Sequence, residues 1–275
     1  MITHCGLLWH CYVSRKSVAY GKRQEQNLSC LSGDASNFNR GRMSRYLSCG
    51  QAMTTETEVV FLFDVDNTLL DNDRVDRDIR LYIEGECGVQ SRDRYIAIFE
   101  ELRAKLGYSD YLGTLQHYRN EERCDPQLLV QMSLFLMDYP FAERLYPRSI
   151  DTLKHLSTLG KTVILSDGDV TFQPRKILRS GLWEAVEGRV LVYVHKEQML
   201  ADVARRFPAR HYIMVDDKLR ILTSMKKIWE NRLTTVFPHQ GHYACDPATV
   251  AAYAPADITI EHVGDLLNYD LTAFL

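Results

Sequence analysis

Two aspartates separated by one residue follow a continuous hydrophobic stretch. Val59 to Phe63 are all apolar, and Asp64 and Asp66 come directly after them. An apolar run without alternation is typical of a strand buried on both faces of a parallel sheet. If the extended backbone continues, both carboxylates point the same way at the carboxyl end of the strand, where open α/β sheets bind ligands. Two crowded carboxylates favour a hard divalent cation such as Mg²⁺, which often also binds substrate phosphate.

An isolated pair of this kind has a simpler interpretation, in which one aspartate caps the following turn and the other is solvated. The later strands argue against it, because they too are followed by polar residues. These are Ser166 after 162–165, Lys196 after 190–194, and Asp216 with Asp217 after 212–215. A turn is predicted over 166–169. The carboxyl ends of parallel strands share one edge of a sheet, so we expect these side chains to lie together.

Predicted strands and helices alternate from residue 147 onward. Further strands are expected over 233–237 and 258–260. This alternation is typical of an α/β fold, a doubly wound parallel sheet that resembles a Rossmann fold.

Residues 71–146 show helical periodicity and no convincing strand. Apolar residues recur at helical spacing from Tyr95 to Leu106, and Asp125-Pro126 is typical of a helix start. A normal crossover needs only a dozen or so residues. We therefore predict a helical domain over 71–146, inserted into a core of 53–70 and 147–275. In the alternative interpretation these helices only cover one face of the sheet.

Residues 1–52 differ from the rest of the chain. They hold four of the seven cysteines and seven basic residues against two acidic ones, without sustained periodicity. Three interpretations remain open: a flexible tail, a targeting peptide, or residues upstream of a natural start at Met43 or Met53.

Deletion of residues 1–52 tests this interpretation. We expect the truncated chain to stay soluble and to keep its activity, because the predicted domains begin at residue 53. Circular dichroism and an activity assay check this, and loss of soluble protein on deletion would contradict it.

The composition indicates an ordinary soluble protein. The formal net charge is −3 and 45% of residues are hydrophobic, which gives no reason to expect nucleic acid or a membrane as partner. Seven scattered cysteines without CxxC pairing favour reduced thiols and a cytoplasmic location. Oligomeric state leaves no signal in the sequence.

The four polar segments, in this order, resemble the motifs of the haloacid dehalogenase superfamily of phosphotransferases. That family has a DxDx(T/V) motif, a Ser or Thr, a Lys and a terminal acidic pair, and this chain carries DVDNTLL over 64–70. The resemblance covers residues from Val59 to the C-terminus. It implies that residues 71–146 correspond to the helical C1 cap of the family.

The resemblance implies a role for each polar residue. Asp64 would attack phosphorus and form an aspartyl phosphate, while Asp66 would protonate the leaving oxygen and then activate water. Ser166, Lys196 and Thr68 would bind the phosphoryl group, Lys196 with its compact positive charge.

The same resemblance implies a Mg²⁺ site made by Asp64, the backbone carbonyl of Asp66, and Asp216, with Asp217 behind them. The family usually has a third acid a few residues later, and this chain has Arg220 or its neighbours there instead. We therefore expect Asp216 to be the metal ligand of the pair, with Asp217 supporting the site in place of that acid.

Two other lysines compete with Lys196 for the third motif. Lys176 follows the second motif, and Lys218 follows the acidic pair. Lys196 lies 30 residues after Ser166 and 20 before Asp216, and this spacing favours it.

Asp66 separates the activities of the family, because dehalogenases need no general acid and typically lack this second aspartate. We therefore expect a Mg²⁺-dependent phosphatase acting on a small phosphorylated metabolite. The alternatives are a phosphomutase resembling β-phosphoglucomutase, a dehalogenase-like hydrolase, and a catalytically silent binding protein on the same fold. The loop of His239 and His242 is either a substrate contact or a solvated surface loop.

Overall fold

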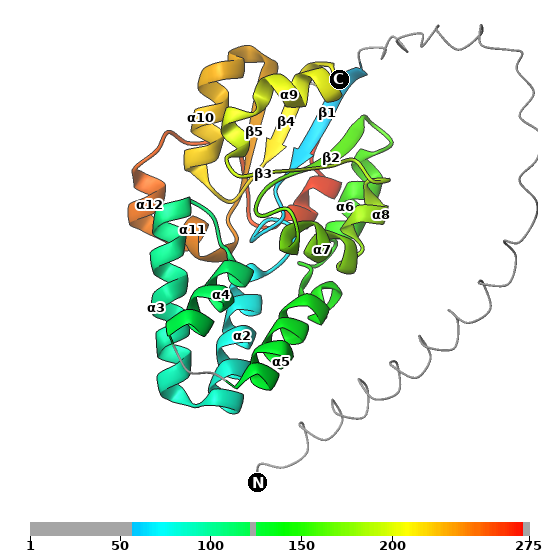
Figure 1. Cartoon of the computed structure of the whole chain (residues 1–275). Coiled ribbons are helices and arrows are strands. Elements are labelled where there is room, and N and C mark those ends of the chain that lie inside the picture. Colours follow the sequence, from blue (N-terminus) through cyan, green and yellow to red (C-terminus); the bar gives the residue numbers. More distant parts are fainter. Residues whose placement is uncertain (1–56, 122–124, 272–275) are drawn as a thin grey trace, which may run out of the picture. The chain divides into compact units, whose positions relative to one another are not determined.

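A six-stranded parallel sheet forms the core of the fold. The computed structural model describes residues 57–121 and 125–271, so the predicted N-terminal extension lies outside the described residues. The strand order is β3-β2-β1-β4-β5-β6, and every neighbouring pair is parallel (Figure 1). The strands are β1 (Thr57–Phe63), β2 (Lys161–Asp167), β3 (Val190–Tyr193), β4 (Ala209–Val215), β5 (Leu233–Pro238) and β6 (Ile258–Ile260).

Strand β1 is buried on both faces, which explains its unbroken apolar sequence. Val59, Phe61 and Phe63 belong to one hydrophobic cluster, and Val60 and Leu62 belong to another. Successive side chains of a strand point to opposite faces of the sheet. Each face of the sheet at β1 therefore has its own apolar layer.

Helices cover both faces of the sheet, which confirms the predicted doubly wound α/β architecture. One cluster includes side chains of α6 (Ser149–Leu156), α7 (Phe172–Arg179) and α8 (Leu182–Ala185). The other includes side chains of α9 (Leu200–Arg206) and α10 (Leu219–Trp229). The connections also hold the short elements η2 (Lys196–Gln198), η3 (Glu230–Arg232), α11 (Gly241–Cys245), α12 (Pro247–Ala251) and η4 (Val263–Leu267).

Among the described residues, four α-helices and a short 3₁₀ helix follow β1 before the chain returns to the sheet through α6. They are α2 (Asn72–Cys87), α3 (Val89–Leu106), α4 (Tyr111–Glu121), α5 (Pro126–Asp138) and η1 (Phe141–Arg144). Figure 1 shows α2 to α5 grouped beyond the carboxyl ends of the strands. The division into a cap over 71–146 and a core stays a prediction.

The predicted start of α5 is confirmed, and α3 ends directly after the apolar residues that predicted it. Helix α3 stops at Gly107, which adopts a left-handed φ of 82°, a conformation that glycine takes without steric cost. Helix α5 begins after Asp125, whose side chain accepts a hydrogen bond from the Gln127 backbone N–H at 3.0 Å.

The turn predicted over 166–169 is wrong at its start. Strand β2 continues to Asp167, because Ser166 and Asp167 still pair with Val192 and Tyr193 of β3. Their polar side chains resemble a turn in the sequence, but pairing with the neighbouring strand keeps the backbone extended. Ser166 is therefore held rigidly at the end of the sheet.

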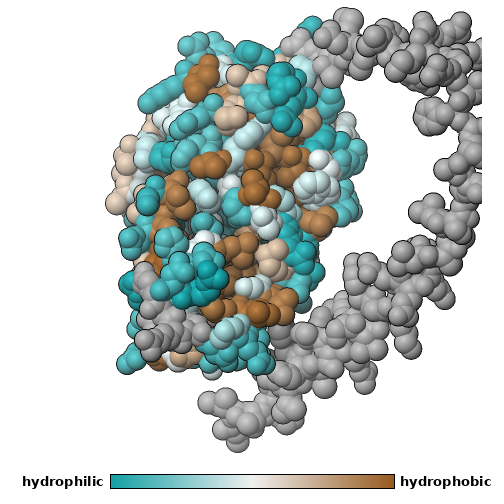
Figure 2. All heavy atoms as spheres, viewed as in Figure 1, coloured by the Kyte–Doolittle hydropathy of each residue, from teal (hydrophilic) through white to brown (hydrophobic). Residues whose placement is uncertain are grey.

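The face shown in Figure 2 carries polar side chains with hydrophobic patches between them. Val130 and Leu134 on α5 are 57% and 56% exposed. Exposed apolar side chains of this kind are ordinary on a folded protein. None of the described helices has both the length and the apolar character that crossing a membrane requires.

Candidate active site

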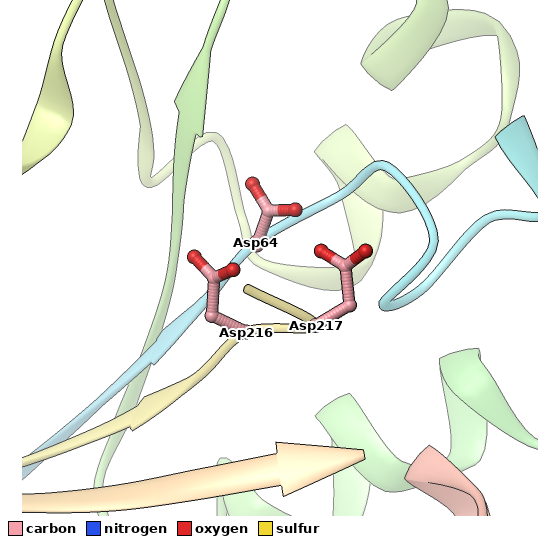
Figure 3. A group of neighbouring side chains, drawn as sticks. All are labelled: Asp64, Asp216 and Asp217. Carbon is pink, nitrogen blue, oxygen red and sulfur yellow. The ribbon is translucent and has the colours of Figure 1, made fainter. Parts of the chain in front are cut away.

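Three buried carboxyl groups meet at the carboxyl ends of β1 and β4. Asp64 follows β1, Asp216 and Asp217 follow β4, and their ligand atoms lie within 4.8 Å of one another. Figure 3 shows the three carboxyl groups pointing to the same side of the two strands. The parallel pairing of β1 with β4 places Phe63 beside Val215. Asp64 and Asp216, the next residues, therefore leave their strands at the same level of the sheet.

The charge of this cluster is only partly compensated by the protein. Within the described part of the chain, Oδ2 of Asp64 and both carboxyl oxygens of Asp217 are buried without a hydrogen-bond partner. Burial raises the pKa of Asp216 to about 6, with Lys196 opposing the rise and Asp64 adding to it. Burial likewise raises the pKa of Asp217. Buried carboxylates need a positive charge nearby, from a side chain or from a metal ion. The carboxyl oxygens of these three aspartates therefore fit a hard divalent ion.

Lys196 contacts the carboxylate cluster directly. Its Nζ lies 2.5 Å from Oδ1 of Asp64 and 2.7 Å from Oδ2 of Asp216, and its side chain is buried. Its backbone N–H donates to Asp167 Oδ1 at 2.7 Å. Burial lowers the pKa of Lys196, but the attraction of Asp216 and Asp64 is stronger, so the pKa is raised overall. Lys196 is thus a fixed positive charge beside Asp64.

The carboxyl group of Asp66 contacts different residues from those that the carboxyl group of Asp64 contacts. Lys176 Nζ is 2.7 Å from Asp66 Oδ1. The side-chain amide of Gln173 donates to Ser166 Oγ at 2.9 Å and to Asp66 Oδ2 at 3.4 Å. The structure therefore links Asp66 and Ser166 through Gln173, a residue that the sequence analysis did not single out.

Thr68 connects the first and last motifs. Its hydroxyl oxygen accepts a hydrogen bond from the Asp217 backbone N–H at 3.1 Å. The Thr68 side chain is fully buried. Its contact fixes the acidic pair relative to the loop after β1, and its predicted role in phosphate binding stays a prediction.

The histidine loop after β5 packs against the loop after β1. His242 Nδ1 lies 2.6 Å from Asp73 Oδ1, and the His242 backbone N–H donates to Asp73 Oδ2 at 2.8 Å. Asn67 has a left-handed φ of 60°, and its side chain donates to Asp73 at 2.9 Å. Burial raises the pKa of Asp73, but the hydrogen bonds from His242 and Asn67 outweigh it, and the pKa is lowered.

Gly241 in this loop has no room for a side chain. Its φ is +72°, and a Cβ atom there would lie 2.4 Å from Asn67 Cβ. We expect Gly241→Ala to lower the free energy of unfolding by at least about 1 kcal/mol and to reduce activity, because the displaced Asn67 is next to Asp66. Denaturant titration and turnover measure both effects.

Gly181→Ala is the matched control for this substitution. Gly181 has a similar φ of +82°, but nothing lies within 4 Å of its Cβ position. It therefore measures the backbone penalty without the clash. Equal destabilisation by the two substitutions would contradict the packing role of Gly241.

A cavity of about 940 Å³ is lined by Asp66 and its neighbours in the loop after β1. Its lining combines side chains from the sheet side with side chains from the helices after β1, including Asp66, Lys218, Tyr243, Arg103, Tyr108 and Tyr111. Arg103 of α3 donates to the Tyr243 hydroxyl at 3.2 Å. A cavity of this size holds a small-molecule ligand, and α3 and α4 contribute part of its wall.

Comparisons with known proteins agree with this geometry. The model of the haloacid dehalogenase-like hydrolase family matches residues 59–228. A haloacid dehalogenase-like hydrolase from Burkholderia xenovorans has 62% sequence identity and a TM-score of 0.74, with 78% of this chain and 99% of that chain covered. No curated protein matches the chain.

More distant structures share the fold alone. L-2-haloacid dehalogenase from Xanthobacter autotrophicus is 17% identical with a TM-score of 0.53, over 76% of this chain and 96% of that one. The magnesium-bound YfnB from Bacillus subtilis is 15% identical with a TM-score of 0.52, over 78% and 98% of the two chains. Together with the family match, the 62% identity establishes that this chain belongs to the haloacid dehalogenase-like hydrolase family.

Proposed function

We propose that this chain is a Mg²⁺-dependent phosphatase that hydrolyses a small phosphorylated metabolite through an aspartyl phosphate on Asp64. The observation that supports this most strongly is the second carboxyl group, Asp66, which lines the cavity. Displacing an alkoxide from phosphorus calls for a proton donor, whereas halide leaves carbon without one. Asp66 therefore favours phosphate esters over haloacids as substrates.

Asp64 acts as the nucleophile of the reaction, and Asp66 acts as its general acid and base. Asp64 attacks phosphorus while the bond from phosphorus to the leaving oxygen breaks, and Asp66 gives that oxygen its proton. Water then attacks the phosphoryl group, Asp66 takes the proton from water, and Asp64 is restored. Lys196 and the hydroxyl of Ser166 would hold the phosphoryl oxygens.

A metal ion fits beside these residues, because buried carboxyl oxygens of Asp64 and Asp217 lack partners in the described structure. Asp64, Asp216 and the backbone carbonyl of Asp66 would hold Mg²⁺, with Asp217 in the same carboxylate cluster. When bound, Mg²⁺ would neutralise charge between the anionic nucleophile and the anionic substrate. We also propose a cytoplasmic location, because the cysteine content favours reduced thiols. The net charge and the hydropathy support neither nucleic acid nor a membrane as partner.

Phosphate release from a panel of sugar phosphates, nucleotides and an aryl phosphate tests this proposal. We expect turnover with Mg²⁺ and none with chelator. Halide release from 2-haloacids is measured in parallel, because a dehalogenase-like hydrolase is the competing function. Halide release without phosphate release would contradict the proposal.

A further inference from the structure

Helix α7 presents two polar side chains to the carboxyl group of Asp66. Gln173 and Lys176 are three residues apart, so they lie on the same side of the helix. Lys176 is completely buried, and its Nζ is 2.7 Å from Asp66 Oδ1. Gln173 Nε2 is 3.4 Å from Asp66 Oδ2. Each oxygen of Asp66 thus faces a different residue of α7.

Lys176 is the one cation within ion-pairing distance of Asp66 in the part of the chain that the structure describes. Lys196, in contrast, contacts Asp64 and Asp216. The two buried lysines are therefore assigned to different carboxylates. Lys196 pairs with Asp64, the proposed nucleophile, and Lys176 pairs with Asp66, the proposed general acid and base.

Other groups fix the position of the Lys176 ammonium. It donates to Asn72 Oδ1 at 3.0 Å, and the rings of Phe172 and Tyr111 lie 5.6 Å and 6.0 Å away. Asn72 in turn donates to the Tyr111 hydroxyl at 3.3 Å. These contacts come from α2, α4 and α7, so the ammonium has little freedom to follow a moving carboxylate.

A purely stabilising role explains this arrangement poorly. Burying a lysine costs desolvation energy, and a buried ion pair often contributes little to stability compared with apolar residues of the same volume. The Asp66 side chain is 21% exposed, toward the cavity that it lines. The pair therefore fixes a carboxylate that faces the space for substrate.

We propose that Lys176 is a positioning residue that holds Asp66 for proton transfer, an inference that rests on the proposed phosphatase function. Lys176 pairs with Oδ1 of Asp66. Oδ2, whose one hydrogen bond within the described residues is the longer contact to Gln173, is left to face the substrate. In the first step the proton moves from Oδ2 to the leaving oxygen as its bond to phosphorus breaks. In the second step Oδ2 takes a proton from the attacking water.

Leaving-group dependence of kcat/KM tests the proposal. Lys176→Met is compared with Asp66→Asn and with the double variant, on an alkyl phosphate and on an aryl phosphate with an acidic phenol. An alkoxide needs the proton from Asp66 much more than a phenolate does. We expect Lys176→Met to lower kcat/KM on the alkyl phosphate by about 10²-fold and on the aryl phosphate far less, with no further loss when Asp66→Asn is already present.

Arg179→Met on the same helix is the control, because Arg179 is exposed and does not contact Asp66. Lys176→Gln, which removes the charge but keeps a donor, replaces Lys176→Met if the latter does not fold. We expect Lys176→Gln to show the same dependence on the leaving group, with a smaller loss of kcat/KM. Equal losses on both substrates, or losses that add to those of Asp66→Asn, would overturn the proposal.

A crystal structure of Lys176→Met gives a readout that does not depend on activity. We expect the Asp66 carboxyl group to turn away from its present position. An unchanged Asp66 side chain would reject the positioning role even if the wild-type chain hydrolyses none of the phosphates. Inactivity of the wild type on every phosphate would instead reject the phosphatase function.

Discussion

Asp64→Asn should lower kcat/KM for phosphate release by about 10⁴-fold or more, the scale of loss seen when a catalytic nucleophile is removed. Asparagine keeps the shape of the side chain, but its amide cannot form the aspartyl phosphate. Asp64 is buried and lies 2.5 Å from Lys196, so no solvent-exposed group can easily replace it. Steady-state kinetics with the best substrate of the panel measure the loss.

Two controls accompany this substitution. Asp151→Asn changes an exposed carboxyl group on α6 and should leave kcat/KM unchanged. Asp64→Ala removes the side chain and excludes slow conversion of asparagine back to aspartate. Wild-type turnover by Asp64→Ala would show that another residue is the nucleophile.

Asp217→Asn is expected to stabilise the metal-free protein and to weaken its response to Mg²⁺. Both carboxyl oxygens of Asp217 are buried without a hydrogen-bond donor in the described residues, and burial raises its pKa. A neutral amide removes the buried charge while the backbone N–H can still donate to Thr68. Thermal unfolding in chelator and in excess Mg²⁺ measures both effects.

The direction of the pH dependence follows from the raised pKa of Asp217. In chelator, the folded state binds a proton that the unfolded state has already lost, so wild-type stability falls as pH rises above the ordinary carboxyl pKa. This fall should be shallower in Asp217→Asn. For the wild type, Mg²⁺ at 100 times its Kd should contribute about 2.7 kcal/mol. A full Mg²⁺ response in Asp217→Asn would exclude this carboxylate from the metal site.

The parallel sheet and the polar residues at the ends of its strands could be predicted, because each strand is recognised from a short stretch of sequence. The apolar run before Asp64 and the strand before Asp216 each specify a buried parallel strand, and parallel pairing then brings their ends together. This logic predicted that Asp64, Lys196, Asp216 and Asp217 would meet. It did not predict that the carboxyl group of Asp66 pairs with Lys176.

The contacts of Asp66 could not be predicted, because they come from residues far away in the sequence. Gln173 and Lys176 are 107 and 110 residues from Asp66, and their approach depends on how α7 packs over the sheet. The contact of His242 with Asp73 spans 169 residues. Sequence spacing favoured Lys196 as the lysine of the third motif, but it carried no information about a second buried lysine.

Trapping a phosphoryl group on Asp64 tests the central claim most directly. Asp66→Asn is mixed with an aryl phosphate and Mg²⁺, quenched in acid, digested and analysed by mass spectrometry. The phenolate leaves without a proton from Asp66, but hydrolysis of the intermediate lacks its base, so the intermediate should accumulate. We predict one phosphoryl group on the peptide that contains Asp64. Hydrolysis of the same ester by the wild type, with no phosphoryl group on this peptide in either protein, would contradict the mechanism.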